Sequence, residues 1–228
     1  IRTKPTELDI KRYEEVGNRP ISLIPAKLEY THMTHERNNL PEYWGITHIH
    51  HFYTRRNYYA LTLISGIKDP QLRRAALFCA LTIMENNATR RNRFYIDKRR
   101  PNGSPIGPLS NTLYVPTLQT ETNIGRKMLQ VLESVQKVHS SWPKVRAIVS
   151  NQSATNLSQI PDASIDFIFT DPPFGGNINY SEQNILYEWW LGIKTNNQAE
   201  AITNSVQKKG IQEYTHLMTL VFSEYARV

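Results

Sequence analysis

The most constraining feature of this sequence is an apolar run that leads directly into a rigid polar loop. Residues 165–170 read Ile-Asp-Phe-Ile-Phe-Thr, and residues 171–176 read Asp-Pro-Pro-Phe-Gly-Gly. A short, mostly apolar run is typical of a strand in a parallel sheet that is covered on both faces. A β-branched run at 145–149 predicts an earlier strand, and a helix is expected over 181–191. This order of strands, loop and helix predicts an α/β fold.

The residues before this region are expected to be mostly helical. Apolar residues at helical spacing predict helices over 51–67 and 122–139, with a last helix over 212–228. Asp69-Pro70 is a helix-start signal, a capping Asp followed by Pro at the first helical position, and it predicts a helix that runs to about Asn87. Residues 89–119 show no period and contain a turn-rich stretch, so they are expected to be irregular.

These elements divide the chain into three expected segments. Residues 1–45 contain several prolines and no sustained period, which favours an extended N-terminal arm. Residues 46–142 are expected to form a helical segment with a basic loop, and residues 143–228 a partial α/β core that carries the Asp-Pro-Pro-Phe loop. The chain of 228 residues begins with Ile1 and stops in a helical pattern at Val228, so we expect it to be a fragment of a longer protein.

Composition narrows the setting in which this chain works. No apolar run approaches the roughly 20 residues that span a bilayer, and the N-terminus has no signal-peptide pattern. Cys79 is the one cysteine, so an internal disulfide and a Cys-rich zinc ribbon are excluded. A cytoplasmic protein without a membrane partner is expected. The formal net charge of +7 suits a polyanionic partner, because Lys and Arg neutralise phosphates.

The positive charge is concentrated between residues 90 and 100, where it alternates with aromatic residues. Phosphate contacts by the cations and base stacking by the aromatic rings would make this segment a nucleic-acid contact. A solvated loop whose aromatic residues pack inward is the alternative. The residues expected to contact nucleic acid are Arg90, Arg91, Arg93, Tyr95, Lys98, Arg99, Arg100 and, outside this segment, Tyr180.

The loop at 171–174 combines two hydrogen-bond acceptors with an aromatic ring. The exocyclic amino nitrogen of adenine or cytosine is a poor nucleophile, because its lone pair is delocalised into the ring. The Asp171 carboxylate and the Pro172 carbonyl can draw its two N–H bonds out of the ring plane, and proline holds the loop rigid. Phe174 can stack on a flipped base. A strand-ending turn, with Asp171 as a local cap, is the alternative.

This segment resembles the Asp-Pro-Pro-aromatic signature of the DNA amino-methyltransferases, which modify adenine N6 or cytosine N4. The likeness extends over 160–174 and continues through Asn177, Asn179 and residues 180–182. Upstream, residues 51–57, His-Phe-Tyr-Thr-Arg-Arg-Asn, are similar to a Phe-Thr-x-Arg-Gln/Asn element in a subgroup of bacterial adenine-specific DNA methylases. Asp at the first position of the motif favours adenine N6 over cytosine N4.

The resemblance implies an S-adenosylmethionine-dependent enzyme that methylates DNA, such as those of restriction–modification systems. It implies a partial Rossmann-like fold with an added helical segment and an N-terminal arm. The catalytic residues would be Asp171, Pro172, Pro173 and Phe174, and Asp171 and Gly175 would also contact the cofactor. An RNA base amino-methyltransferase is one alternative. A non-catalytic nucleic-acid-binding module is the other.

A methyltransferase of this fold usually has a Gly-rich turn after its first strand, where the cofactor approaches the backbone. The sequence has 10 glycines, and none of them forms that pattern. We expect the turn in the remaining part of the same polypeptide or in a partner subunit. This chain alone would then hold the base-side half of the site, without a full cofactor pocket, and would be inactive by itself.

Histidines cluster in the first quarter of the chain, which raises the question of a metal site. Five of the seven histidines are His32, His35, His48, His50 and His51. Two of them, His48 and His50, would point the same way on a strand. Because no Cys or nearby carboxylate pair completes a ligand set, no metal site is predicted.

Overall fold

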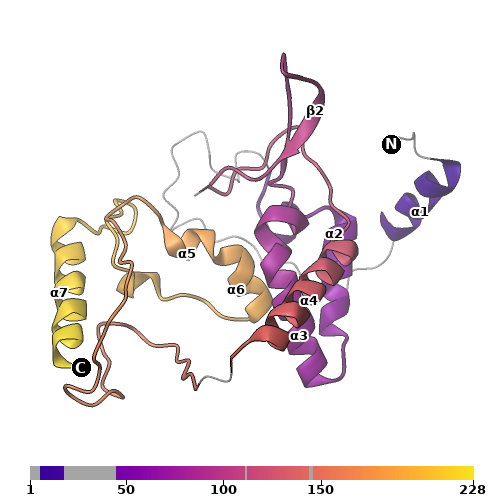
Figure 1. Ribbon diagram of the computed structural model, residues 1–228. Helices are drawn as coiled ribbons and strands as arrows, with labels where there is room; N and C mark the ends of the chain where they lie inside the picture. Colours follow the sequence, from indigo (N-terminus) through magenta and orange to yellow (C-terminus); the bar gives the residue numbers. More distant parts are fainter. Residues whose placement is uncertain (1–5, 18–44, 111, 144–145) are drawn as a thin grey trace. The chain divides into compact units, whose positions relative to one another are not determined.

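The computed structural model describes residues 6–17, 45–110, 112–143 and 146–228. Most of the expected N-terminal arm, including His32 and His35, therefore lies outside the described residues. The described chain combines helices with a two-stranded antiparallel sheet (Figure 1). It divides into two compact units, the first containing 6–17, 45–142 and 186–193 and the second containing 146–185 and 194–228. In the described part of the chain, no helix has the length and apolar character needed to cross a membrane.

The first unit contains most of the helices. They are α1 (Glu7–Gly17), the short turn η3 (Ile49–Phe52), α2 (Arg55–Ser65), α3 (Pro70–Ile83), the π-turn η4 (Met84–Ala88), α4 (Ile124–Ser141) and most of α6 (Ile185–Leu191). The start signal at Asp69-Pro70 is confirmed. The Asp69 carboxylate accepts the backbone N–H groups of Gln71 and Leu72 at 2.7 and 2.9 Å, and so satisfies two donors that a helix N-terminus leaves without a partner.

Helix α2 begins and ends inside the range that the sequence pattern predicts. The helix begins at Arg55 behind the Thr54 cap, whereas the sequence pattern placed its start at 51. It therefore buries Tyr58, Leu61 and Ile64, while Leu63 is 56% exposed. In α3, burial is confined to the second half of the helix. Cys79 and its neighbours near the end of the helix are buried, but Leu72 is 59% exposed, because only the second half of α3 packs inward.

Residues 93–106 form a β-hairpin, so the expectation of an irregular segment was wrong here. Strand β1 (Arg93–Asp97) pairs with β2 (Arg100–Ile106), and Asp97 opposite Arg100 closes the turn. The register shifts between Tyr95 and Asp97, and Gly103 has a φ of +69° on the opposite strand, as in a β-bulge. The two prolines of β2 concealed this strand in the sequence, but proline is tolerated in an edge strand.

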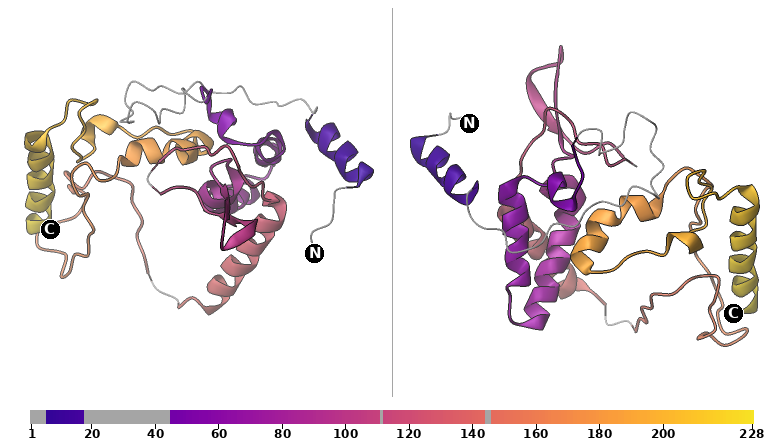
Figure 2. Two further views of the ribbon diagram at one scale, coloured as in Figure 1. Left: turned by 90° about the horizontal axis from the view of Figure 1, so that it is seen from above. Right: turned by 180° about the vertical axis from the view of Figure 1, so that it is seen from behind.

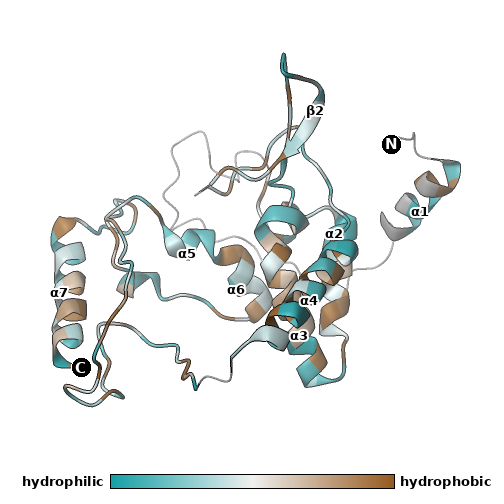
Figure 3. Cartoon of the chain, viewed as in Figure 1, coloured by the Kyte–Doolittle hydropathy of each residue, from teal (hydrophilic) through white to brown (hydrophobic). Residues whose placement is uncertain are grey.

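The hairpin extends beyond the helices of the first unit in Figure 1 and in the right view of Figure 2. Its end, which carries the turn at Lys98 and Arg99, is hydrophilic (Figure 3). Closer to the helices, Phe94 lies across Gly103, where an added Cβ would come within 2.2 Å of the ring. The base of the hairpin is thus packed by an aromatic ring, and its turn is polar.

The second unit contains α5 (Tyr180–Gln183), the turn η5 (Asn197–Ala199) and α7 (Ile211–Arg227). The two strands predicted at 145–149 and 165–170 are absent from its described residues, which is a correction to the expected parallel sheet. A strand needs neighbours that pair with its N–H and C=O groups. The N–H groups of Ser164 and Ile165 instead bind the Val228 carbonyl, at 2.5 and 2.8 Å. Phe167 and Phe169 are 80% and 89% exposed.

Candidate functional site

The Asp-Pro-Pro-Phe loop is held by two tyrosines of α7. The Tyr214 hydroxyl donates a hydrogen bond to the Pro173 carbonyl at 2.7 Å. The Tyr225 hydroxyl lies 3.3 Å from the Thr170 hydroxyl. Tyr214 and Tyr225 are about three helical turns apart, so they lie on the same face of α7. One helix face therefore contacts the loop on both sides of Asp171.

This arrangement treats the acceptors of the two prolines and of Asp171 differently. The Pro173 carbonyl is occupied by Tyr214. Among the residues that the structure describes, no group donates a hydrogen bond to the Asp171 carboxylate or to the Pro172 carbonyl. Asp171 is exposed, and the Phe174 ring is 69% exposed beside it. The two acceptors predicted from the sequence, the Asp171 carboxylate and the Pro172 carbonyl, are thus both available to a ligand.

The glycine pair after the motif has two different structural roles. Gly175 adopts a φ of +55°, a conformation that other residues rarely take. A Cβ on Gly176 would come within 2.9 Å of the Thr203 hydroxyl and 3.0 Å of the Thr203 carbonyl. Gly176 is therefore needed so that the loop can approach Thr203 of the same chain. A cofactor contact at Gly175 stays a prediction.

Residues 194–210 support the segment that follows the motif, which the sequence analysis did not anticipate. The Glu200 carboxylate accepts the backbone N–H of Ser181 at 3.0 Å and its hydroxyl at 2.6 Å. The ammonium of Lys209 donates to the carbonyls of Asn197 and Glu200, and burial lowers the pKa of Lys209. Nothing in the sequence marks these polar residues as different from solvated surface residues.

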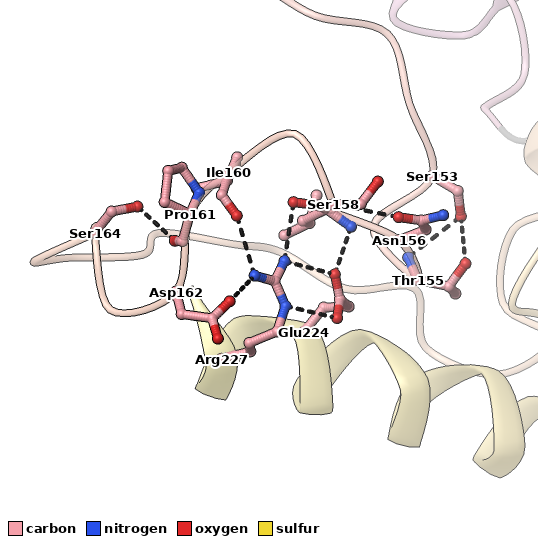
Figure 4. A network of polar contacts seen from close by, with 11 residues as sticks. Ser153, Thr155, Asn156, Ser158, Ile160, Pro161, Asp162, Ser164, Glu224 and Arg227 are labelled. Atoms are coloured by element: carbon pink, nitrogen blue, oxygen red, sulfur yellow. Dashed lines mark hydrogen bonds and ion pairs between the residues drawn. The ribbon is translucent and has the colours of Figure 1, made fainter.

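A second cluster fixes the chain that leads into the motif (Figure 4). Arg227 donates to Glu224, to the carbonyls of Leu157 and Ile160, and to Asp162, at distances of 2.5 to 3.0 Å. Glu224 also accepts the Leu157 backbone N–H at 2.6 Å. The hydrogen bonds from Arg227 and Leu157 lower the pKa of Glu224 to about 2, and those that Arg227 donates to Glu224 and Asp162 raise the pKa of Arg227. Residues 157–162 are thereby tied to the end of α7.

The first unit corrects part of the predicted nucleic-acid surface. Arg91 is only 1% exposed and donates to the Glu85 carboxylate at 3.1 Å and to the Thr112 carbonyl at 2.5 Å. Tyr187 donates to the other Glu85 oxygen at 3.2 Å. Burial lowers the pKa of Arg91, and the charge of Glu85 opposes that shift. Arg91 is an internal ion-pair residue and cannot contact a phosphate.

Arg90 also has partners within the protein. Its side chain donates to Gln119 at 2.9 Å and to the His51 carbonyl at 3.1 Å. Beyond it, the hairpin brings together the other predicted contacts of the basic segment, which are Arg93, Tyr95, Lys98, Arg99 and Arg100. Tyr180, which is 41% exposed, belongs to the second unit. The predicted nucleic-acid residues therefore separate into an internal pair, a hairpin and one tyrosine near the motif.

Three histidine rings of the first unit lie close together. The ring centroids of His50 and His51 are 4.2 Å apart, and those of His48 and His50 are 5.4 Å apart. The backbone N–H of Thr47 donates to Nδ1 of His51 at 3.1 Å. Burial lowers the pKa of His50 and His51. Within the described ranges, no group of His, Cys, Asp and Glu side chains is arranged to hold a metal ion.

The motif loop is open at Asp171 and Phe174 and closed at Gly176. The loop offers two acceptors and an exposed ring, whereas the space beside Gly176 is filled by Thr203. The sequence contains no further pair of adjacent glycines that could cradle a cofactor. Comparison with known proteins adds no assignment, since the chain matches no family model, no curated protein and no solved structure.

Proposed function

We propose that this protein takes part in the methylation of an exocyclic amino group in DNA, with adenine N6 as the acceptor and S-adenosylmethionine as the methyl donor. One observation carries the proposal. In the motif loop, α7 binds the Pro173 carbonyl and leaves the Asp171 carboxylate and the Pro172 carbonyl without a donor among the described residues. An amino group has two N–H bonds, and the Asp171 carboxylate and the Pro172 carbonyl can each accept one of them next to an exposed aromatic ring.

The residues of this chain would act on the base. Asp171 and Pro172 each accept one N–H of the amino group and draw the hydrogens out of the plane of the ring. The nitrogen lone pair is then less delocalised and more nucleophilic. Phe174 stacks on the face of the flipped base and fixes its position, so that much of the rate enhancement comes from orientation. Asp171 also stabilises the positive charge that develops on the nitrogen as it gains a methyl group.

The methyl group itself comes from the cofactor. When bound, S-adenosylmethionine would supply an electrophilic methyl on its sulfonium and would leave as the neutral thioether, and the proton released by the methylated nitrogen would pass to the Asp171 carboxylate or to water. The described residues do not form a cradle for this cofactor, so we propose that its Gly-rich loop belongs to a further segment or to a partner subunit. In the same arrangement, residues 165–170 would be a strand of a Rossmann-like sheet. Their exposed Phe167 and Phe169 would be covered there.

The proposal is tested by tritiated methyl transfer with the full-length gene product on unmethylated DNA. In Asp171→Asn, an amide NH2 group, which is a hydrogen-bond donor, replaces one carboxylate oxygen. We expect the rate to fall on the order of 100-fold or more. Asp166→Asn, a nearby change outside the loop, should leave the rate within about twofold. Equal rates for wild type and Asp171→Asn would refute the proposed role of the loop.

Structured RNA is the second substrate for this assay. Transfer to RNA and not to DNA would favour the RNA alternative, and digestion of the product identifies the methylated base. No transfer to either substrate would favour the non-catalytic nucleic-acid-binding module. For the isolated 228-residue chain, the proposal also predicts no tight binding of S-adenosylmethionine, which calorimetry can check.

A further inference from the structure

The β-hairpin of the first unit is not explained by the chemistry of the motif loop. Its strands run antiparallel from Arg93 to Ile106, with Asp97 opposite Arg100 and the turn at Lys98 and Arg99. The turn lies at the end farthest from the helices of its unit (Figures 1 and 2). A hairpin that only completed the core would bury its apolar side chains, but Tyr95 and Ile96 are 50% and 56% exposed.

Some cations of the basic segment are paired within the protein, and others are exposed. Arg91 forms an internal ion pair with Glu85. Arg90 donates hydrogen bonds to Gln119 and to a backbone carbonyl. Lys98 and Arg99, in contrast, are exposed. The sequence from 93 to 106 holds four cations and the single anion Asp97. The projecting end of the hairpin therefore carries a local positive charge that intramolecular pairing does not remove.

The backbone at this turn is unstrained. Among the described non-glycine residues, positive φ values occur at Ala163 and Lys208, so Lys98 and Arg99 both have negative φ. No turn geometry therefore demands lysine or arginine at these positions. Charged residues also protect an edge strand from pairing with another chain, but the prolines of β2 already remove donors from that edge.

We propose that this hairpin is a docking element for double-stranded DNA, with Lys98 and Arg99 contacting backbone phosphates. A two-stranded ribbon fits the major groove of B-form DNA, which is about 12 Å wide. The major groove of an A-form RNA helix is too narrow for such a ribbon, so the geometry favours DNA over duplex RNA. Tyr95, half exposed on the same hairpin, is placed to contact the sugar and phosphate wall of the groove.

The choice of DNA rests on the proposed function, but binding can be measured without methyl transfer. The test is fluorescence anisotropy of the full chain with a labelled DNA duplex, in the absence of S-adenosylmethionine. Lys98→Glu together with Arg99→Glu is expected to weaken binding about tenfold or more near 0.1 M salt. With alanine at both positions, the slope of log K against log salt should fall by about 2.

The matched control reverses another exposed pair in the same unit. Arg73 and Arg74 lie in the first turns of α3 and are exposed, and acidic residues there suit the helix dipole. Arg73→Glu with Arg74→Glu makes the same change in net charge and should weaken binding less than about threefold. Equal weakening by the two pairs would overturn the proposal, because the general field of the protein would then explain binding.

Two further outcomes are decisive. Absence of DNA binding by the wild type would overturn the proposal, as would equal affinity for an RNA duplex of the same sequence. If hairpin-dependent DNA binding is found but the wild type transfers no methyl group to DNA, the proposed function fails and the docking element stands. If methyl transfer depends on Asp171 but DNA affinity is unchanged by the substitutions at Lys98 and Arg99, the docking element fails and the proposed function stands.

Discussion

Arg91 in the first unit and Asp171 in the second differ in how their charged groups are bonded and exposed. Arg91 is 1% exposed, and its guanidinium is bound by Glu85 and by the Thr112 carbonyl. Asp171 is exposed and accepts no hydrogen bond from the described residues. Both lie in segments that the sequence analysis assigned to function, yet only one has its polar atoms available to a ligand.

The comparison teaches that position in a motif and availability of atoms are separate properties. In the first unit, the guanidinium of Arg91 joins Glu85 of the π-turn η4 to the Thr112 carbonyl, and Glu85 also accepts the hydroxyl of Tyr187. In the second unit, the surrounding polar groups hold the backbone of the loop through Tyr214 and leave the side chain of Asp171 uncommitted. A substitution at Arg91 should therefore change stability, and one at Asp171 should change chemistry.

Arg91→Met tests the structural side of this comparison and should have the largest effect on stability. Removing the guanidinium leaves Glu85 without its ion-pair partner in a mostly buried site. Because Glu85 is 35% exposed, the loss should be about 2–3 kcal/mol, somewhat below that of a fully buried pair. Hydrogen exchange can localise it, with protection lost in α3 and retained in α7.

Arg74→Met is the matched control for that experiment. Arg74 is exposed on α3, so its replacement should change the free energy of unfolding by less than about 0.5 kcal/mol. If Arg91→Met were as mild as this control, the ion pair would be unimportant for the first unit. A loss of DNA affinity in Arg91→Met without any loss of stability would restore the predicted phosphate contact.

Local signals in the sequence predicted the helices well and the sheet poorly. Asp69-Pro70 located the start of α3 because a cap and a proline act within a few residues. The apolar run at 165–170 could not be tested locally, since a strand exists only with neighbours, and the described residues provide none. The hairpin was missed for the reverse reason: Pro101, Gly103 and Pro105 indicated turns, but they are accommodated in an edge strand with a bulge.

Some residues of the candidate site could be predicted from local sequence, and others could not. Asp171, Pro172 and Phe174 could be selected from their chemistry alone, because the motif is contiguous in sequence. Tyr214 could not, because its contact with Pro173 depends on how α7 lies against the loop. The burial of Arg91 was equally hidden, since a run of cations in sequence does not reveal which one faces inward.

Tyr214→Phe tests whether α7 positions the loop. The change removes one hydrogen bond, to the Pro173 carbonyl, and should cost about 1 kcal/mol of stability. If that bond orients the adjacent Pro172 carbonyl, the rate constant kcat for methyl transfer by the full-length gene product should fall about tenfold with little change in KM. A purely structural role would leave kcat unchanged when the assay is run well below the melting temperature.

Tyr225→Phe is the matched comparison, because it also removes a tyrosine hydroxyl from the same face of α7. Its contact with Thr170 is longer, at 3.3 Å, and lies before Asp171 in the chain. We expect a change in kcat of less than about threefold. Equal losses for both tyrosines would mean that α7 supports the loop as a whole and does not act through the Pro173 carbonyl.

Glu224→Gln should produce the smallest and most specific effect, a change in how stability depends on pH. Contacts with Arg227 and Leu157 lower the pKa of Glu224 from 4.5 to about 2. A carboxylate with a lowered folded-state pKa stabilises the fold above its unfolded pKa, and this contribution is lost as the pH falls through the folded value. The difference in urea midpoint between wild type and Glu224→Gln should therefore be greatest above pH 4.5 and shrink towards pH 2. Glu133→Gln, an exposed change on α4, should show no such trend. A difference that stays constant over this range would mean that the carboxylate charge of Glu224 is not what ties residues 157–162 to α7.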